Sequence, residues 1–129
     1  MLEWLPYVTF LRESISHGGG KEEEGNRMGQ PMKLLMTWDI RPGRETAYLE
    51  FATREFAPGL VKLGIEWTDA WYTVVGEGPQ VLAGGVAKDM ETMTNILETE
   101  EWAKLEEKLK TYVMNYKRKV IPHTGRFQL

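Results

Sequence analysis

The sequence predicts an α+β domain with one antiparallel sheet, and three observations support this fold class. Residues 33–40 alternate between two faces like a β-strand and lead through a Pro-Gly turn into a helical pattern. Residues 65–75 are rich in β-branched and aromatic side chains, and a Gly/Pro turn connects them to a second extended run at residues 80–87. A further helical pattern precedes a short last strand at residues 117–121.

The first strand has an apolar face and a mixed face, and a helix with one apolar stripe follows it. Because proline removes a helical donor, we expect Pro58-Gly59 to end or kink this helix. The apolar face carries Leu34, Met36, Trp38 and Ile40, the mixed face carries Lys33, Leu35, Thr37 and Asp39, and the helical stripe is Tyr48, Phe51, Ala52 and Phe56.

The second strand, residues 65–75, is the strongest strand signal in the chain. Strict alternation predicts that Trp67, Asp69 and Trp71 lie on one face and that Tyr72 lies on the other. In the strand that returns antiparallel to it, the paired glycines Gly84 and Gly85 indicate a bulge or a closely approaching neighbour.

Two consecutive helices follow. Asp89 and Thr99 are suitable N-caps, because their side chains accept hydrogen bonds from the first helical turn.

The predicted order of elements is therefore β-α-β-β-α-β, which is the ferredoxin-like arrangement. It consists of a four-stranded antiparallel sheet with helices on one face. Because the second strand is apolar on both faces, we expect the uncovered sheet face to pack against a second copy. The longer helix has an apolar face of Trp102, Leu105, Leu109, Tyr112, Val113 and Tyr116.

Residues 1–31 are predicted to form an N-terminal extension, flexible in part, and residues 32–129 the folded domain. The extension contains a Gly- and Glu-rich run of linker composition. Because Lys-Glu-Glu codons can spell a bacterial ribosome-binding sequence, one interpretation is that residues 1–27 are a translated leader and the natural start is Met28 or Met32. The alternative is a genuine amphipathic arm. Glu3 argues against a signal peptide.

Composition excludes several functional classes. The chain has 129 residues, enough for one domain with one core. A net charge of −3, from 16 basic and 19 acidic side chains, predicts neither a nucleic-acid nor a membrane-surface partner. No apolar run approaches the roughly 20 residues that a membrane span needs. Cysteine is absent, which excludes thiolate zinc ligands and fits a cytoplasmic location.

Three local features of residues 32–129 resemble those of a known superfamily. They are Arg41-Pro42-Gly43-Arg44 after the first strand, the helical Tyr48–Phe51, and Thr99–Trp102 at the start of the long helix. The domain resembles the dimeric α/β barrels, which include the antibiotic-biosynthesis monooxygenase-like, NIPSNAP-like and stress-responsive barrel proteins. The resemblance implies a homodimer with a ring-lined pocket for flat, apolar molecules. It disfavours haem degradation, because residues 100–116 lack the histidine that some of these barrels use.

Four aromatic residues are the candidate pocket set, namely Trp38, Trp67, Trp71 and Tyr72. The alternative is ordinary packing, because large rings also fill cores and subunit interfaces. Since alternation separates Tyr72 from Trp67 and Trp71, we expect that these residues cannot all line one pocket.

Asp69 and His123 are the weak catalytic candidates. A carboxylate among indole rings can act as a general base. The alternative for Asp69 is exposure at a strand edge or an ion pair with arginine or lysine. His123 could reach a pocket mouth, although a solvated tail histidine is the favoured interpretation. No metal site is predicted, since the domain has one histidine without clustered carboxylates.

Two function classes remain. The favoured class is a small homodimeric protein that binds a small apolar or aromatic molecule, without a cofactor or a catalytic constellation. The alternative is a cofactor-independent monooxygenase or isomerase acting on an aromatic or polyketide-like substrate, which would supply its own reactive carbanion.

Overall fold

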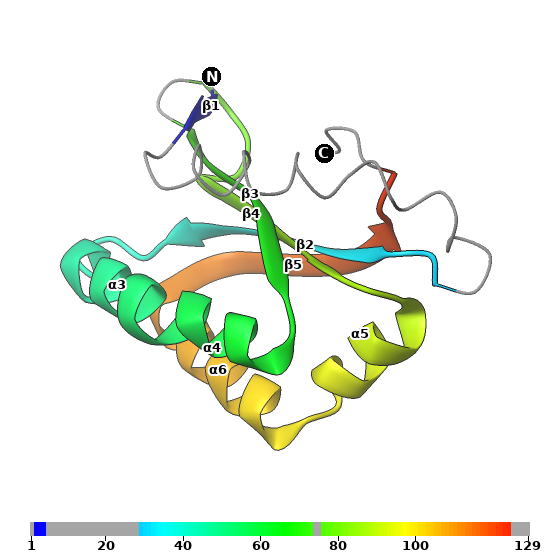
Figure 1. Ribbon diagram of the computed structural model, residues 1–129. Coiled ribbons are helices and arrows are strands. Elements are labelled where there is room, and N and C mark those ends of the chain that lie inside the picture. Colours follow the sequence, from blue (N-terminus) through cyan, green and yellow to red (C-terminus); the bar gives the residue numbers. More distant parts are fainter. Residues whose placement is uncertain (1, 5–28, 74–75, 125–129) are drawn as a thin grey trace.

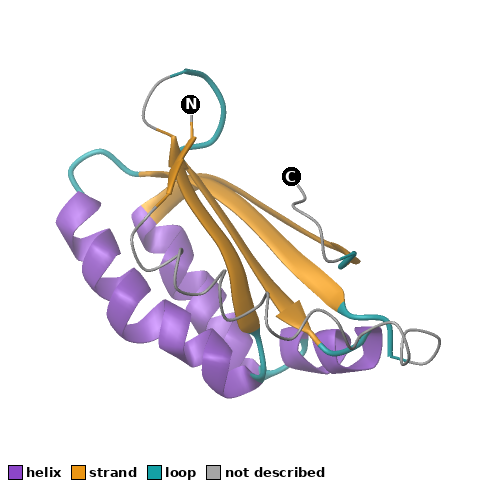
Figure 2. Ribbon diagram, turned by 45° about the horizontal axis from the view of Figure 1, so that its top comes forward, coloured by secondary structure: helices purple, strands orange, loops and turns teal. Residues whose placement is uncertain are grey.

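The computed structural model describes residues 2–4, 29–73 and 76–124. Within these residues the chain forms one antiparallel sheet of five strands. The strand order is β1-β3-β4-β2-β5. The helices of the described residues all lie on one face of the sheet (Figures 1 and 2). The strands are β1 (Leu2–Trp4), β2 (Met32–Ile40), β3 (Glu66–Thr73), β4 (Val81–Ala87) and β5 (Val113–Pro122). The helical elements are α3 (Glu45–Phe51), the π-helix η2 (Ala52–Phe56), α4 (Ala57–Leu63), α5 (Met90–Leu97) and α6 (Glu100–Tyr112).

The predicted fold class is confirmed. Strands β2 to β5 and their helices follow the order β-α-β-β-α-β, and the four strands pair as β3-β4-β2-β5, the ferredoxin-like arrangement. Strand β1, which the sequence did not predict, adds to the β3 edge with Leu2 opposite Thr73 and Trp4 opposite Trp71. Most of the predicted N-terminal extension lies outside the described residues, so its boundaries and the alternative start stay predictions.

The main core lies between the helices and one face of the sheet. The predicted apolar face of β2 is confirmed, because Leu34, Met36, Trp38 and Ile40 are all buried in this core. We call the opposite side of the sheet the outer face. It carries a smaller apolar group, the outer cluster, which consists of Leu35, Trp71 and Leu82 with Ile121 packed against them.

A bulge in β3 corrects the predicted alternation of this strand. Trp67 pairs with Gly85, but the next paired residue is Asp69, opposite Gly84, so Thr68 is an extra residue in β3. A bulge places two residues opposite one and shifts the side chains that follow it. The glycine pair therefore marks a bulge in its partner strand, and an added Cβ at Gly85 would meet the Ile65 side chain.

The bulge divides the aromatic residues of β3 differently from the prediction. Trp67 and Tyr72 pack with the main core, whereas Trp71 belongs to the outer cluster. The expectation that Trp67, Asp69 and Trp71 share a face is therefore wrong, as is the separation of Trp67 from Tyr72. One inserted residue accounts for both differences.

The first helical segment does not end at Pro58. It continues through η2 and α4 to Leu63 and ends at Gly64, whose φ of 111° is left-handed. In η2 the N–H of Ala57 donates to the carbonyl oxygen of Ala52, five residues earlier, in the π-helical pattern. Pro58 follows directly, in the first turn of α4, and it has no backbone N–H to donate to the preceding turn, so the π-helical pattern lies where proline interrupts α-helical bonding.

The second helical pair has the predicted caps but an earlier end. Asp89 accepts from the N–H of Thr92 at 2.7 Å, and Thr99 accepts from the N–H of Trp102 at 3.1 Å. Helix α6 ends at Tyr112 rather than near residue 116. The ladder between β2 and β5 begins at the pair Ile40–Val113. The residues from Val113 to Tyr116, which helical spacing had assigned to the helix, therefore belong to strand β5.

Candidate ligand-binding site

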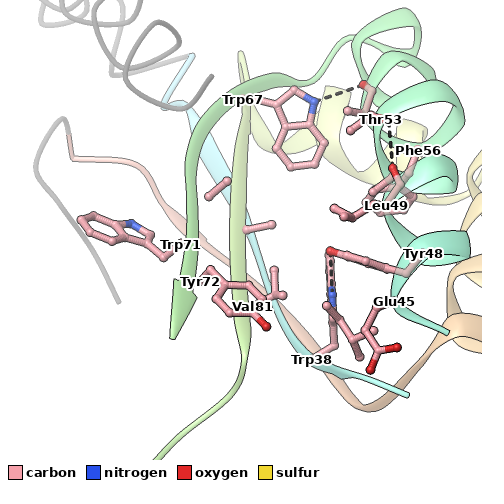
Figure 3. A pocket seen from close by; sticks show the side chains of 15 residues that line it. Trp38, Glu45, Tyr48, Leu49, Thr53, Phe56, Trp67, Trp71, Tyr72 and Val81 are labelled. Atoms are coloured by element: carbon pink, nitrogen blue, oxygen red, sulfur yellow. Dashed lines mark hydrogen bonds between the residues drawn. The ribbon is translucent and has the colours of Figure 1, made fainter. Parts of the chain in front are cut away.

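A cavity of about 390 Å³ lies between the sheet and the first helical segment (Figure 3). Its size falls within the range of small-molecule sites, roughly 300–1,000 Å³. Strands β2, β3 and β4 form one wall, and α3, η2 and the start of α4 form the other. The residues that border it are Trp38, Ile40, Glu45, Tyr48, Leu49, Ala52, Thr53, Phe56, Ala57, Trp67, Ala70, Trp71, Tyr72, Val81 and Ala83.

The cavity exists because several of the side chains that border it are small. Ala70 and Ala83 are cross-strand partners on β3 and β4, and Ala52 begins the π-helix on the facing wall. Protein interiors are otherwise packed nearly as densely as organic crystals, so such a space marks a place where neighbours do not interdigitate. The three alanines provide width, while the rings around them provide the walls.

The rings are fixed against one another by edge contacts. Trp38 meets Phe56 edge-on, with centroids 6.0 Å apart and planes at 90°, and meets Tyr48 at 6.3 Å and 69°. Phe56 also contacts Trp67 at a centroid distance of 6.2 Å. Such edge-to-face arrangements are favoured by the ring quadrupoles. These contacts hold the rings of the aromatic wall against one another.

The indole N–H groups of Trp38 and Trp67 both donate hydrogen bonds within the protein. Trp38 Nε1 donates to the Tyr48 hydroxyl oxygen at 3.1 Å, and Trp67 Nε1 donates to the carbonyl oxygen of Ala57 at 3.1 Å. These bonds satisfy the polar edge of each indole, which is the requirement for burying tryptophan. The rings thereby offer mainly carbon surface to the cavity.

One end of the cavity is more polar than the other. In Figure 3, Trp67 lies at one end, and Trp38, Tyr72 and Glu45 lie at the other. Gln80 Nε2 donates to the Tyr72 hydroxyl oxygen at 3.1 Å. Gln80 was not identified from the sequence, because it follows Pro79 in a turn and its role depends on contacts with two other strands.

The four predicted pocket residues are divided by the structure. The side chains of Trp38, Trp67 and Tyr72 border the cavity from β2 and β3. Trp71 also borders it, but its indole ring points away, toward the outer face (Figure 3). Tyr48 and Phe56, which the sequence indicated only as a helical stripe, complete the aromatic wall.

Asp69 lies on the outer face and is not among the residues that border the cavity. Its carboxylate forms an ion pair with Lys33, with 2.5 Å between Nζ and Oδ2, and accepts a hydrogen bond from the Thr68 hydroxyl at 3.0 Å. The Lys33 and Asp69 side chains are only 1% and 5% exposed. Of the interpretations raised from the sequence, the ion pair describes Asp69.

His123 is buried at the end of β5, so the expectation of a solvated tail histidine is wrong. Its backbone N–H donates to the Pro31 carbonyl at 2.8 Å, and its carbonyl accepts from Gln30 Nε2 at 3.0 Å. These contacts hold it beside the start of β2, and it does not border the cavity.

Two kinds of feature are absent from the described residues. No group of three or more histidine, aspartate or glutamate side chains is placed to hold a metal ion in residues 2–4, 29–73 and 76–124. In the same ranges, no helix has both the length and the apolar character needed to cross a membrane.

Comparisons with known proteins identify the fold. No family model matches the sequence, and no curated protein matches it. Among solved structures, a NIPSNAP family protein from Agrobacterium tumefaciens matches with a TM-score of 0.55 and 18% identity, over 74% of this chain and 88% of that protein. A NIPSNAP-like domain protein from Burkholderia xenovorans matches with a TM-score of 0.56 and 18% identity, over 78% and 91%. An ethyl tert-butyl ether D (EthD) family protein from Bacillus halodurans matches with a TM-score of 0.54 and 17% identity, over 72% and 99%.

The predicted resemblance to the dimeric α/β-barrel superfamily is therefore confirmed at the level of the fold. The chain shares the ferredoxin-like architecture of NIPSNAP and EthD family proteins. At these identities the likeness concerns the architecture alone.

Proposed function

We propose that this protein binds a small, flat, largely apolar molecule between the sheet and its first helical segment. The observation that carries the proposal is the cavity of about 390 Å³, which has an ordered aromatic wall. Flat ligands gain from stacking and edge contacts with such rings as well as from the burial of apolar area.

Binding is favoured over the alternative, a cofactor-independent monooxygenase or isomerase. That chemistry needs a proton acceptor beside the reacting carbon. Among the described residues that border the cavity, the carboxylate is that of Glu45, which is solvent-exposed at one end. The sequence candidates Asp69 and His123 do not border the cavity.

The proposal includes a homodimer in the cytoplasm that forms through the outer face of the sheet. This is the side of the sheet that bears no described helix (Figure 2), although the outer cluster on it is already buried within one chain. The support for a dimer is the ferredoxin-like fold that the chain shares with the solved structures, because proteins of this fold are often dimeric. Sedimentation velocity at micromolar concentration tests it, and a stable monomer would contradict it.

The binding proposal is tested with 2-isopropenylnaphthalene, a flat hydrocarbon probe, by quenching of tryptophan fluorescence. We expect saturable binding to the unmodified protein. The substitution Ala52→Phe places a ring in the cavity and should weaken binding about tenfold or more, which corresponds to about 1.4 kcal/mol. The change in affinity should appear without a change in the circular dichroism spectrum.

The matched control is Ala103→Phe, the same substitution at an exposed position of α6 that does not border the cavity. This variant should bind the probe as the unmodified protein does. Equal binding by all three proteins would place the probe elsewhere and contradict the proposal, and so would the absence of saturable binding.

A further inference from the structure

We propose that Tyr72 selects ligands with a neutral, hydrogen-bond-accepting oxygen at one end, as in a flat aromatic ketone or quinone. The inference rests on the proposed binding function and adds a chemical class to it. It depends on the direction in which the Tyr72 hydroxyl donates its hydrogen, and Gln80 determines that direction.

The orientation of the Gln80 amide is fixed by a backbone group. The N–H of Ile40 donates to Gln80 Oε1 at 2.7 Å. A backbone N–H can only donate, so the atom that faces it must be the carbonyl oxygen of the amide. The Gln80 NH₂ group therefore faces Tyr72, 3.1 Å from its hydroxyl oxygen.

Tyr72 must consequently direct its own hydrogen elsewhere. An amide NH₂ group has no lone pair to accept it, and the Tyr72 oxygen already accepts from Gln80. The Tyr72 side chain borders the cavity (Figure 3), and no hydrogen bond from its hydroxyl reaches an acceptor among the described residues. A ligand oxygen at this end of the cavity would accept this hydrogen in place of water.

Gln80 is a positioning residue held from several sides. Its backbone N–H donates to Asp39 Oδ1 at 2.8 Å, and its carbonyl accepts from the N–H of Thr73 at 2.8 Å. Asp39 is in turn fixed by Asn115, whose Nδ2 donates to Oδ2 at 2.8 Å. These bonds join the ends of β2, β3 and β5 to the start of β4, so the direction of the Tyr72 hydroxyl is set before a ligand arrives.

Glu45 narrows the ligand class further. Its carboxylate borders the same end of the cavity as Tyr72 (Figure 3). A negative charge there disfavours a carboxylate or sulfonate on the ligand, because like charges at close range repel. The expected acceptor is therefore a neutral carbonyl oxygen, while the rest of the ligand is a flat apolar body that meets Trp38, Phe56 and Trp67.

The test compares two probes of nearly the same shape, 2-acetylnaphthalene and 2-isopropenylnaphthalene, which differ by an oxygen in place of a CH₂ group. The unmodified protein should bind the ketone about fivefold more tightly than the hydrocarbon, the effect of one net hydrogen bond. In Tyr72→Phe this preference should disappear, so that the two probes bind with similar affinity.

A second substitution, Gln80→Glu, reverses the hydrogen bond without removing the hydroxyl. The new carboxylate can accept from both the Ile40 N–H and the Tyr72 O–H, so the backbone group keeps its partner and Tyr72 donates away from the cavity. The ketone preference should be lost here too, with hydrocarbon binding retained. Gln30→Glu, the same change near the end of β5, should keep the preference.

The outcomes separate this inference from the proposed function. If neither probe binds, the binding proposal fails, and this inference fails with it. If both probes bind the unmodified protein with equal affinity, the cavity binds apolar molecules but Tyr72 does not select for oxygen. A ketone preference that survives in Tyr72→Phe or in Gln80→Glu would also overturn the inference.

Discussion

The two faces of the sheet differ in how closely their side chains are packed. The helix-facing side is lined by rings and alanines and leaves a cavity of about 390 Å³. The outer face is filled around a buried ion pair, Lys33–Asp69, next to the outer cluster. The side with incomplete packing is the apolar one, and the side with charges is closely packed.

Adjacent residues of β4 show the contrast most directly. Ala83 borders the cavity, whereas an added Cβ at Gly84 would lie 3.2 Å from Lys33 Cε and 3.3 Å from Asp69 Oδ2. Dense packing around a charge pair excludes water and holds the geometry of both partners, while loose packing beside rings admits a ligand. The difference locates the candidate site on the helix-facing side and assigns Asp69 a structural role.

The largest predicted effect is that of breaking the ion pair on the outer face. Lys33→Met should lower the free energy of unfolding by about 3–5 kcal/mol, because it leaves the Asp69 carboxylate buried without its cation. The double variant Lys33→Met/Asp69→Leu should recover most of this loss, since it removes both charges. Urea unfolding monitored by circular dichroism measures both changes.

The matched control is Lys108→Met, which breaks the exposed pair between Lys108 and Glu55 on the helix side. Solvent screens such pairs, so its effect should be much smaller. If Lys33→Met were as mild as the control, or the double variant as unstable as the single one, the ion pair would not have the role assigned to it.

A smaller effect should distinguish the two faces within one strand. Gly84→Ala should reduce stability by about 1–3 kcal/mol, because the new methyl group crowds the ion pair. Ala83→Val should change stability by less than about 1 kcal/mol, because the cavity has room for its two additional methyl groups. Thermal and urea unfolding compare the pair. Equal losses in the two variants would mean that the cavity side is as tightly packed as the outer face.

The smallest predicted effect concerns a neutral polar group in the main core. Tyr116 lies against Trp38, with ring centroids 6.2 Å apart, and its hydroxyl donates to Glu106 Oε2 at 2.7 Å. Burial, reinforced by Glu106, raises the pKa of Tyr116 well above its ordinary value. The unfolded chain therefore loses this proton first, so the stabilising contribution is present below about pH 10 and falls as the pH rises further.

The substitution Tyr116→Phe isolates this contribution. Below pH 9 the variant should be less stable by about 1 kcal/mol, the net value of one hydrogen bond. Above pH 10 the unmodified protein should lose stability faster than the variant, by about 1.4 kcal/mol per pH unit. Urea unfolding at pH 8 and pH 11 provides the comparison, and parallel pH profiles would contradict the assignment.

The sequence predicted the parts of the fold that depend on local periodicity. The alternation of β2, the two N-caps and the hairpin between β3 and β4 are encoded within short windows and are confirmed. The end of α6 was predicted incorrectly, because residues from Val113 onward also fit a helical stripe. Their pairing with β2, far away in the sequence, decides in favour of a strand.

The candidate site was less predictable for the same reason. The rings of Trp38, Trp67 and Tyr72 were identified, but the bulge at Thr68, which places the latter two together, exists only in the pairing of β3 with β4. Gln80 gives no sequence signal, because its significance comes from Ile40 and Tyr72, which meet it only after the strands assemble. A glutamine after a turn is otherwise an ordinary surface residue.

The extra residue in β3 has a consequence for how this chain is compared with others. Without Thr68 the strand would alternate regularly, and Trp67, Asp69 and Tyr72 would each keep the face they have now. A homologous strand lacking that residue would therefore present equivalent side chains on equivalent sides. An alignment that forbids gaps inside strands would shift one half of β3 by a position and match a residue of the inner wall with one of the outer wall. Allowing one gap at Thr68 restores the correspondence.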